Sequence, residues 1–246
     1  MYVNTTGLIL REIPYKDSSK ILTVMTASEG RLTVSAHGYN RKNNKIAAVT
    51  QLLVFSEMTL QLKRDRWTLI EARSVEQFIG LRSDIVLLAL GAYFAELIEA
   101  LSDEDSHSVE LLPLCLNALY ALSEQIKPPA LIKSVFELRL MAISGFMPNT
   151  NCCISCGDAQ PERCFLDVYG GSIRCSKCGS SGLVLSKGAL NAIRYIISCD
   201  RKKLFSFSLG QEAQNELITA AEGYLLAQLD RSFRTLDYYQ GVKCIL

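Results

Sequence analysis

The sequence predicts an α+β protein in which an N-terminal five-stranded barrel is followed by an all-helical domain that carries a cysteine-rich insert. Short apolar runs typical of strands fill the first eighty residues, and the apolar period changes to three and four from about residue 83. Two C-x-x-C pairs then interrupt the helical pattern. We therefore expect domains at residues 1–80 and 81–246, with the insert at 151–182.

The strand region contains five runs rich in Val, Ile, Leu and Thr, at residues 7–13, 21–27, 31–37, 52–63 and 67–73. In the third run, Leu32, Val34 and Ala36 alternate with polar residues, which is typical of a half-buried strand. Glu29-Gly30 predicts a tight turn before this run. No helical pattern here is long enough to cover a sheet. Because closure removes exposed strand edges, the pattern favours a small closed barrel.

The second domain is expected to consist of amphipathic helices at residues 83–102, 109–125, 128–145, 186–199 and 211–229. Pro128-Pro129 ends the second of these helices and begins the third. The acidic run from Asp103 to Asp105 breaks the apolar period, and we interpret it as a solvated loop rather than a metal site.

The insert contains two C-x-x-C pairs separated by eighteen residues, which is typical of a four-cysteine zinc site. A two-residue spacing lets one tight turn aim both sulfurs at the same point. Gly157 and Gly179 follow the two pairs and would permit a positive φ in each turn. Four thiolates leave no open position for water, so we expect one structural Zn²⁺. The predicted ligands are Cys153, Cys156, Cys175 and Cys178.

Other interpretations of the cysteines are redox disulfides or unrelated buried thiols. Cys152 could replace Cys153, but its spacing to Cys156 does not mirror the second pair. The role of Cys164 stays open. Between the pairs, Gly170-Gly171 predicts a hairpin turn, so the insert is expected to resemble a zinc ribbon.

A basic N-terminal region suggests an anionic partner. Residues 1–80 carry 11 Lys and Arg against 7 Asp and Glu, whereas residues 81–246 carry 15 against 18. Such cations can track a phosphate backbone, and Trp67 could stack on bases, although a core position is the stronger interpretation. The alternative is a solvated surface. The predicted DNA contacts are Lys16, Lys20, Arg31, Arg41, Lys42 and Lys45.

Two weaker candidates, Lys133 and Arg139, could receive an acidic peptide end, with a solvated helix face as the alternative. Nucleophile, Walker and dinucleotide motifs are absent from the sequence, so we expect a protein that is not an enzyme. The longest apolar stretch, residues 85–95, is shorter than the ~20 residues of a membrane helix. We therefore expect a cytoplasmic protein with no membrane contact.

Several short motifs follow one another along the chain in a specific order and spacing. They are Gly7-Leu8-Ile9-Leu10-Arg11, the run from Tyr15 to Leu22, Thr26 to Gly30 followed by Arg31-Leu32, Ala36-His37-Gly38, Phe136-Glu137-Leu138-Arg139-Leu140 and Gly145-Phe146-Met147-Pro148. In these motifs the chain resembles the bacterial RecO recombination-mediator proteins along essentially its whole length. At residues 37–40, His-Gly-Tyr-Asn stands where the family often has Lys-Gly-Ala-Arg, which removes cations from this segment.

This resemblance implies an oligonucleotide-binding (OB) barrel, then a helical domain with a zinc insert that acts as a scaffold. It also implies binding to single- and double-stranded DNA and annealing of complementary strands, in association with the nucleoid. The implied partners are RecR and single-stranded-DNA-binding protein (SSB), through the acidic tail of SSB, to help load RecA. Three rival hypotheses are a zinc-ribbon protein that binds RNA or a polymerase, a zinc hydrolase, and a scaffold whose barrel binds protein.

Overall fold

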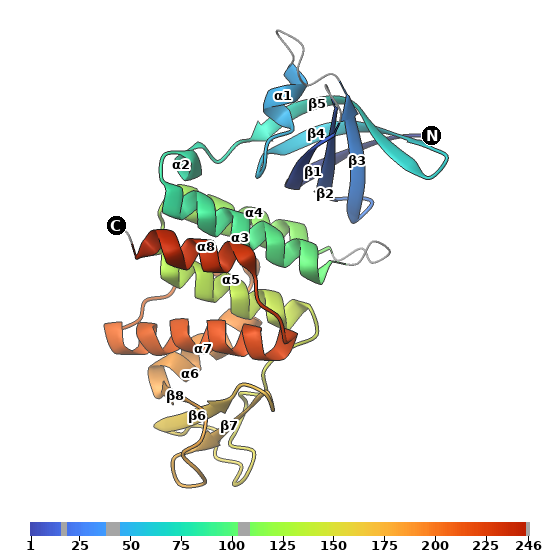
Figure 1. Cartoon of the computed structure of the whole chain (residues 1–246). Helices are drawn as coiled ribbons and strands as arrows, with labels where there is room; N and C mark the ends of the chain where they lie inside the picture. Colours follow the sequence, from blue (N-terminus) through green and yellow to red (C-terminus); the bar gives the residue numbers. More distant parts are fainter. Residues whose placement is uncertain (16–18, 38–44, 103–108, 245–246) are drawn as a thin grey trace. The chain divides into compact units, whose positions relative to one another are not determined.

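The computed structural model describes residues 1–15, 19–37, 45–102 and 109–244, and the chain divides into two compact units (Figure 1). Unit 1 comprises Met1–Ser123 with Phe233–Leu246, and unit 2 comprises Glu124–Ser232. The chain thus leaves unit 1 once and returns to it near its C-terminus. The domain boundary predicted at residue 80 marks the change from strands to helices. It does not coincide with the boundaries of these two units, and it stays a prediction.

Unit 1 begins with a closed five-stranded barrel in the strand order β1-β2-β3-β5-β4, with β4 pairing back onto β1. All neighbouring strands are antiparallel except β3 and β5, which pair in parallel at Val34 and Trp67. The barrel and the helices that follow it confirm the predicted α+β, OB-like fold. The strands are β1 Tyr2–Tyr15, β2 Ser19–Thr26, β3 Arg31–His37, β4 Phe55–Lys63 and β5 Arg66–Glu76.

The barrel core contains the inward-facing side chains that the alternation predicts. Val34 and Ala36 of β3 are fully buried, and Trp67 packs against the same cluster, so it contributes to the core as expected. Gly30 has φ +68° in the turn that joins β2 to β3. The short helix α1, Lys45–Val49, precedes β4 and was not predicted. The remaining core residues are Ile9, Leu22, Val24, Met58, Leu60 and Leu69.

The helices of unit 1 are α2 Ile79–Arg82, α3 Ile85–Leu101, α4 Leu111–Ser123 and α8 Arg234–Lys243. Asp84 caps α3 by accepting hydrogen bonds from the backbone N–H groups of Val86 and Leu87. The chain returns through α8, which packs on α3, where Glu96 accepts hydrogen bonds from the backbone N–H and hydroxyl of Thr235. The sequence predicts α3 and α4 to within two residues but neither α2 nor α8.

Unit 2 holds a small antiparallel sheet, in the order β7-β6-β8, together with α5, α6 and α7. Pro129 opens α5, as the sequence predicts, because proline suits the first turn of a helix. The elements are α5 Pro129–Ile143, β6 Arg163–Asp167, β7 Ser172–Cys175, β8 Leu183–Ser186, α6 Lys187–Ser198, the 3-10 turn η1 Arg201–Lys203 and α7 Gln211–Leu229. Across the described part of the chain, helices that combine the length and apolarity needed to cross a membrane are absent.

Candidate metal centre and nucleic-acid interface

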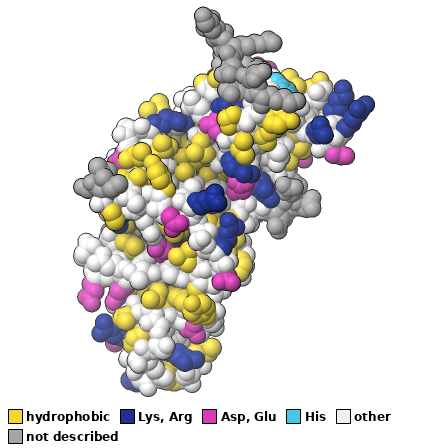
Figure 2. All heavy atoms as spheres, in the orientation of Figure 1, with side chains coloured by type: hydrophobic (Ala, Val, Ile, Leu, Met, Phe, Trp, Pro, Cys, Tyr) yellow, Lys and Arg dark blue, Asp and Glu magenta, His cyan; other side chains and the backbone are white. Residues whose placement is uncertain are grey.

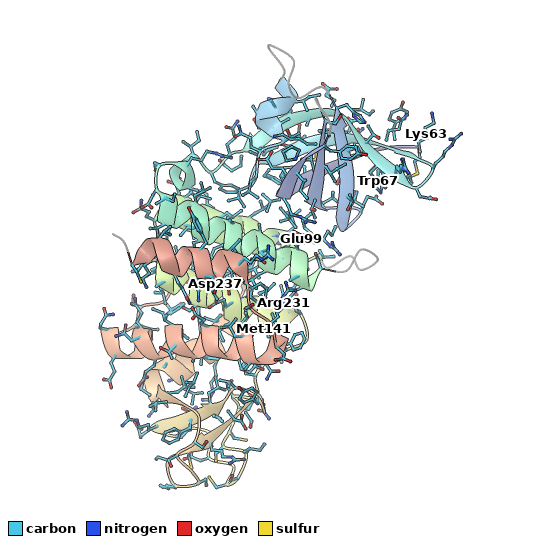
Figure 3. All side chains as sticks on the ribbon, in the orientation of Figure 1. Lys63, Trp67, Glu99, Met141, Arg231 and Asp237 are labelled. Atoms are coloured by element: carbon cyan, nitrogen blue, oxygen red, sulfur yellow. The ribbon has the colours of Figure 1, made fainter. Side chains whose placement is uncertain are left out.

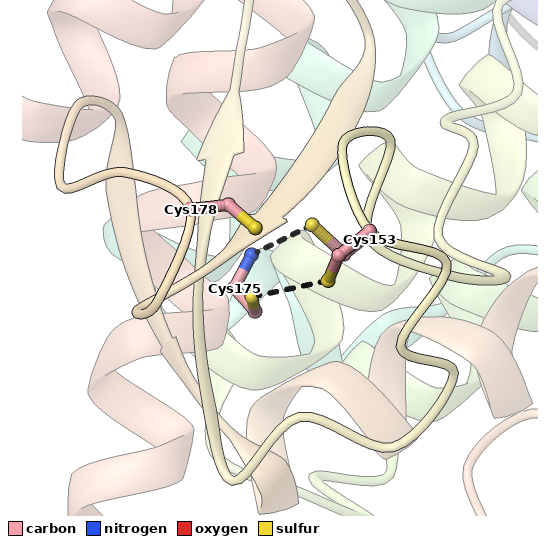
Figure 4. Close-up of side chains that lie close together, drawn as sticks. Cys153, Cys175 and Cys178 are labelled. Carbon is pink, nitrogen blue, oxygen red and sulfur yellow. Dashed lines mark hydrogen bonds between the residues drawn. The ribbon is translucent and has the colours of Figure 1, made fainter.

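The four cysteines of the two C-x-x-C pairs come together at one end of the small sheet in unit 2. Their sulfur atoms all lie within 4.8 Å of one another (Figure 4). Cys153 and Cys175 are buried, whereas Cys156 is exposed. Four thiol sulfurs at this spacing could hold a metal ion.

Two turns of different geometry present the two pairs. In the first, the backbone N–H of Gly157 donates to the Cys153 carbonyl at 2.9 Å, and Gly157 has φ +76°. In the second, the N–H groups of Cys178 and Gly179 both donate to the Cys175 carbonyl, at 2.9 and 3.2 Å. Gly157 thus fulfils the predicted positive φ. The same expectation is wrong for Gly179, because its turn closes without a left-handed residue.

The thiols are crowded enough to shift one another's acidity. Hydrogen bonding lowers the pKa of Cys153 to about 6, chiefly because the backbone N–H of Cys175 donates to its sulfur at 3.3 Å. The sulfurs of Cys156 and Cys175 lie 3.6 Å apart. Hydrogen bonds from Cys178 to neighbouring thiols, first to Cys156, raise its pKa to about 12. One thiolate therefore forms readily, whereas a full set of thiolates needs a cation between them.

Two further cysteines lie near this group without joining it. Cys164 of β6 is fully buried and pairs in register with Cys175 of β7, and burial raises the pKa of its thiol to about 11. Cys152 is half-buried beside Cys153. The group of four sulfurs includes neither residue, as the spacing predicts for Cys152. The hairpin turn predicted at Gly170-Gly171 joins β6 to β7, where Gly171 has φ +63°.

The predicted DNA contacts are only partly placed. Lys16, Arg41 and Lys42 lie outside the described residues, and Lys45 begins α1. The Lys20 ammonium forms an ion pair with Glu12 on the neighbouring strand. The Arg31 guanidinium donates from Nε to the carbonyl of Ser102 at 3.0 Å, just beyond the end of α3. Lys20 and Arg31 therefore have structural roles in unit 1.

The hairpin between β4 and β5 is cationic, and the sequence analysis did not identify it as a candidate DNA contact. Lys63, Arg64 and Arg66 surround its tip and are all exposed, and the dark blue side chains are conspicuous in Figure 2. Arg64 and Asp65 have φ +51° and +57°, as expected for the two central residues of a type I′ turn. In the part of the chain that the structure describes, none of the three cations has an ion pair.

The half-buried Trp67 follows this tip on β5, as Figure 3 shows beside Lys63. The sequence signal was available: Lys-Arg-Asp-Arg lies between two apolar runs that are close enough in sequence to form a hairpin. We call Lys63, Arg64 and Arg66 the cationic hairpin.

The two predicted peptide contacts require a correction. Lys133 is only 2% exposed, and its ammonium lies 2.7 Å from a carboxylate oxygen of Glu137 and 2.7 Å from one of Glu222. The Arg139 guanidinium donates to the carbonyls of Ile196 and Ile197, at 3.3 and 2.7 Å, near the C-terminal end of α6. Both cations stabilise the interior of unit 2, and neither is presented to a partner as a free charge.

Comparison with known proteins covers almost the entire chain. The family described as Recombination protein O N terminal matches residues 1–78, and that described as Recombination protein O C terminal matches residues 82–237. The DNA repair protein RecO of Symbiobacterium thermophilum is 31% identical over 249 residues, covering 98% of this chain and 97% of that protein. The protein of the same name from Acetivibrio thermocellus is 29% identical and covers 99% of each chain. The chain therefore belongs to the RecO family of recombination proteins.

Proposed function

We propose that this protein is a DNA-binding recombination mediator in DNA repair. It binds single- and double-stranded DNA, anneals complementary strands and, together with RecR, helps load RecA onto DNA covered by SSB. It acts without turnover of a substrate, in the cytoplasm at the nucleoid. The whole-length family match supports this proposal, and the observation that carries it in the molecule is the cationic hairpin on an OB-like barrel.

The mechanism that we propose is electrostatic. Cations on the barrel displace the counterions condensed on a phosphate backbone, so two complementary strands can approach each other despite their mutual repulsion. Contacts to phosphate carry no base information, so binding is insensitive to sequence. The cationic hairpin joins the predicted Arg41, Lys42 and Lys45 in this role, because its three side chains are exposed and form no ion pair with any residue that the structure describes.

A hairpin variant that keeps its backbone geometry tests this interface. In the triple variant Lys63→Gln, Arg64→Asn and Arg66→Gln, asparagine tolerates the positive φ of position 64, so only charge is lost. We expect weaker binding to single-stranded DNA and a salt dependence whose slope falls by about 0.7 for each phosphate contact removed. Fluorescence anisotropy across a salt series measures both quantities.

The matched control removes charge elsewhere. Lys202→Gln with Lys203→Gln takes two exposed cations from η1 in unit 2, and it should leave the slope unchanged. If the hairpin variant bound DNA with the same salt dependence as the unaltered protein, the DNA-binding surface would lie elsewhere than on β4 and β5. Replacing Arg41, Lys42 and Lys45 by Ala in parallel tests the predicted loop contacts. Lys20 and Arg31 are less suitable, because their loss also disturbs Glu12 and the end of α3.

The metal that we propose for the four-cysteine site is one structural Zn²⁺. Tetrahedral thiolate sites select zinc or iron, and a site filled by four protein ligands has no open position for catalysis. We expect elemental analysis of purified protein to find about one zinc per chain and no iron. The variant Cys153→Ser should lose most of this zinc, whereas Cys199→Ser, at the C-cap of α6, should keep it. If elemental analysis found no metal in the unaltered protein, the proposed zinc site would be wrong.

Strand annealing with SSB-coated DNA tests the partner assignments. We expect the protein to accelerate annealing of complementary strands coated with SSB, and to do so less when SSB lacks its acidic tail. A second assay, with RecR and RecA added, monitors the formation of RecA filaments. Annealing that proceeds equally with and without the protein would contradict the mediator function, and competition by structured RNA would favour the RNA-binding alternative.

A further inference from the structure

One arginine of α6 holds both ends of the loop that bears the first cysteine pair. The Arg194 side chain donates from Nε and Nη2 to the Thr150 carbonyl, at 2.7 and 2.5 Å. Its Nη2 also donates to the carbonyls of Asn151 and Ala159, each at 2.9 Å. Thr150 and Asn151 precede Cys153 and Cys156, and Ala159 follows them. A single guanidinium therefore ties the start of this loop to its end.

The helix that carries Arg194 is itself fixed at both ends. The Ser186 hydroxyl caps the start of α6 by accepting a hydrogen bond from the backbone N–H of Ala189. Near the end of α6, Arg139 of α5 donates to two successive carbonyls. The half-buried guanidinium of Arg194 thus projects from a rigid element, and this favours a precise loop position.

The charge of Arg194 also suits its position at the loop that bears the first cysteine pair. Arg194 lies close enough to Cys164 for an electrostatic interaction, and Cys164 pairs in register with Cys175. Four thiolates around a divalent cation carry a net charge of −2. A guanidinium nearby offsets part of this charge, and its planar fork can serve several carbonyls at once, whereas an ammonium is a point charge.

We propose that Arg194 is the positioning residue of the metal centre. By closing the loop over residues 150–159, it presents Cys153 and Cys156 to the second pair at the spacing that one metal ion needs. This role rests on the proposed zinc site. Both turns close on the carbonyl of their first cysteine, but the second pair is also anchored in the sheet, because Cys175 ends β7.

Metal release and cysteine reactivity test this role in the full-length, zinc-loaded protein. For Arg194→Ala we expect affinity for zinc to fall about ten- to hundredfold, as measured by competition with a chromophoric chelator. The zinc affinity of Arg194→Lys should lie between that of Arg194→Ala and that of the unaltered protein, because lysine keeps the charge but lacks the planar guanidinium. Arg163→Ala, which removes an exposed cation from β6, is the control and should match the unaltered protein.

Alkylation followed by mass spectrometry separates positioning from a general loss of structure. In Arg194→Ala, Cys153 and Cys156 should react before Cys175 and Cys178, because only the first pair depends on the guanidinium. Equal reactivity of all four cysteines, or zinc affinity like that of the unaltered protein, would overturn the role of Arg194. An unaltered protein that carries no zinc would overturn the metal centre itself, and this outcome is seen before any variant is compared.

Discussion

Lys133 is an ammonium whose charge is retained inside the protein. Burial is the largest single effect and lowers its pKa, but the carboxylates of Glu137 and Glu222 together, through charge and hydrogen bonds, raise the pKa by more, so the net direction is upward. A raised pKa means that the folded state binds this proton more tightly than the unfolded state. The resulting stability is fully present below the unfolded pKa of about 10.4 and is lost as pH rises through the folded pKa. This ion pair therefore contributes throughout the neutral range.

Replacing Lys133 by Met should lower the free energy of unfolding by roughly 3–5 kcal/mol, because it leaves the fully buried Glu137 carboxylate without the ammonium that faces it. Urea denaturation followed by circular dichroism measures this loss. The double variant Lys133→Met with Glu137→Leu removes both buried charges, and it should recover much of the stability. A single variant that costs less than about 1 kcal/mol, with the double variant no better, would show that the pair is not coupled.

The two cysteine turns are alike in sequence but differ as structural elements. A Cβ at Gly157 would have no atom within 4 Å, so Gly157→Ala meets no steric obstacle, and its cost arises from φ +76° alone. We expect this backbone strain to destabilise the metal-loaded turn by about 1–2 kcal/mol. A Cβ at Gly179 would lie 3.7 Å from Cδ of Arg174, an ordinary contact, at a φ that alanine adopts. Competition with a chelator should therefore show weaker zinc binding for Gly157→Ala and unchanged binding for Gly179→Ala. The reverse order would mean that the second turn limits the site.

Elements with a strong period could be predicted from the sequence, whereas those defined by tertiary contacts could not. Strand alternation indicated the barrel, and apolar spacing indicated α3 to α7, because each of these patterns is local. Helix α8 was missed because it buries only Leu236 and Tyr239, which is too few for a visible apolar face. The four-cysteine group was predictable because ligand spacing is encoded along the chain.

The roles of individual cations were harder to predict, because their partners are distant in sequence. Glu222 lies 89 residues from Lys133, and Ser102 lies 71 residues from Arg31. Composition alone cannot distinguish such cations from those of the cationic hairpin, which form no ion pair within the described ranges of the chain. Arg194 was missed for the same reason, since its acceptors are backbone carbonyls 35 to 44 residues away, and carbonyls leave no signature in the sequence.

At the scale of the whole molecule, the proposed metal centre and the barrel belong to different units. The cysteine group lies entirely in unit 2, and the cationic hairpin in unit 1. Because metal-binding free energy becomes folding free energy only for the structure that forms the site, removing zinc should loosen unit 2 selectively.

Hydrogen–deuterium exchange before and after chelation tests this separation. We expect faster exchange in β6, β7 and the loop at 150–159, extending into α6 through Arg194, and unchanged exchange in β1 to β5. The metal-free protein should still bind single-stranded DNA with the salt dependence of the loaded protein, because the cationic hairpin does not depend on the metal. Faster exchange in the barrel, or a loss of DNA affinity on chelation, would instead make zinc a direct part of the DNA-binding mechanism.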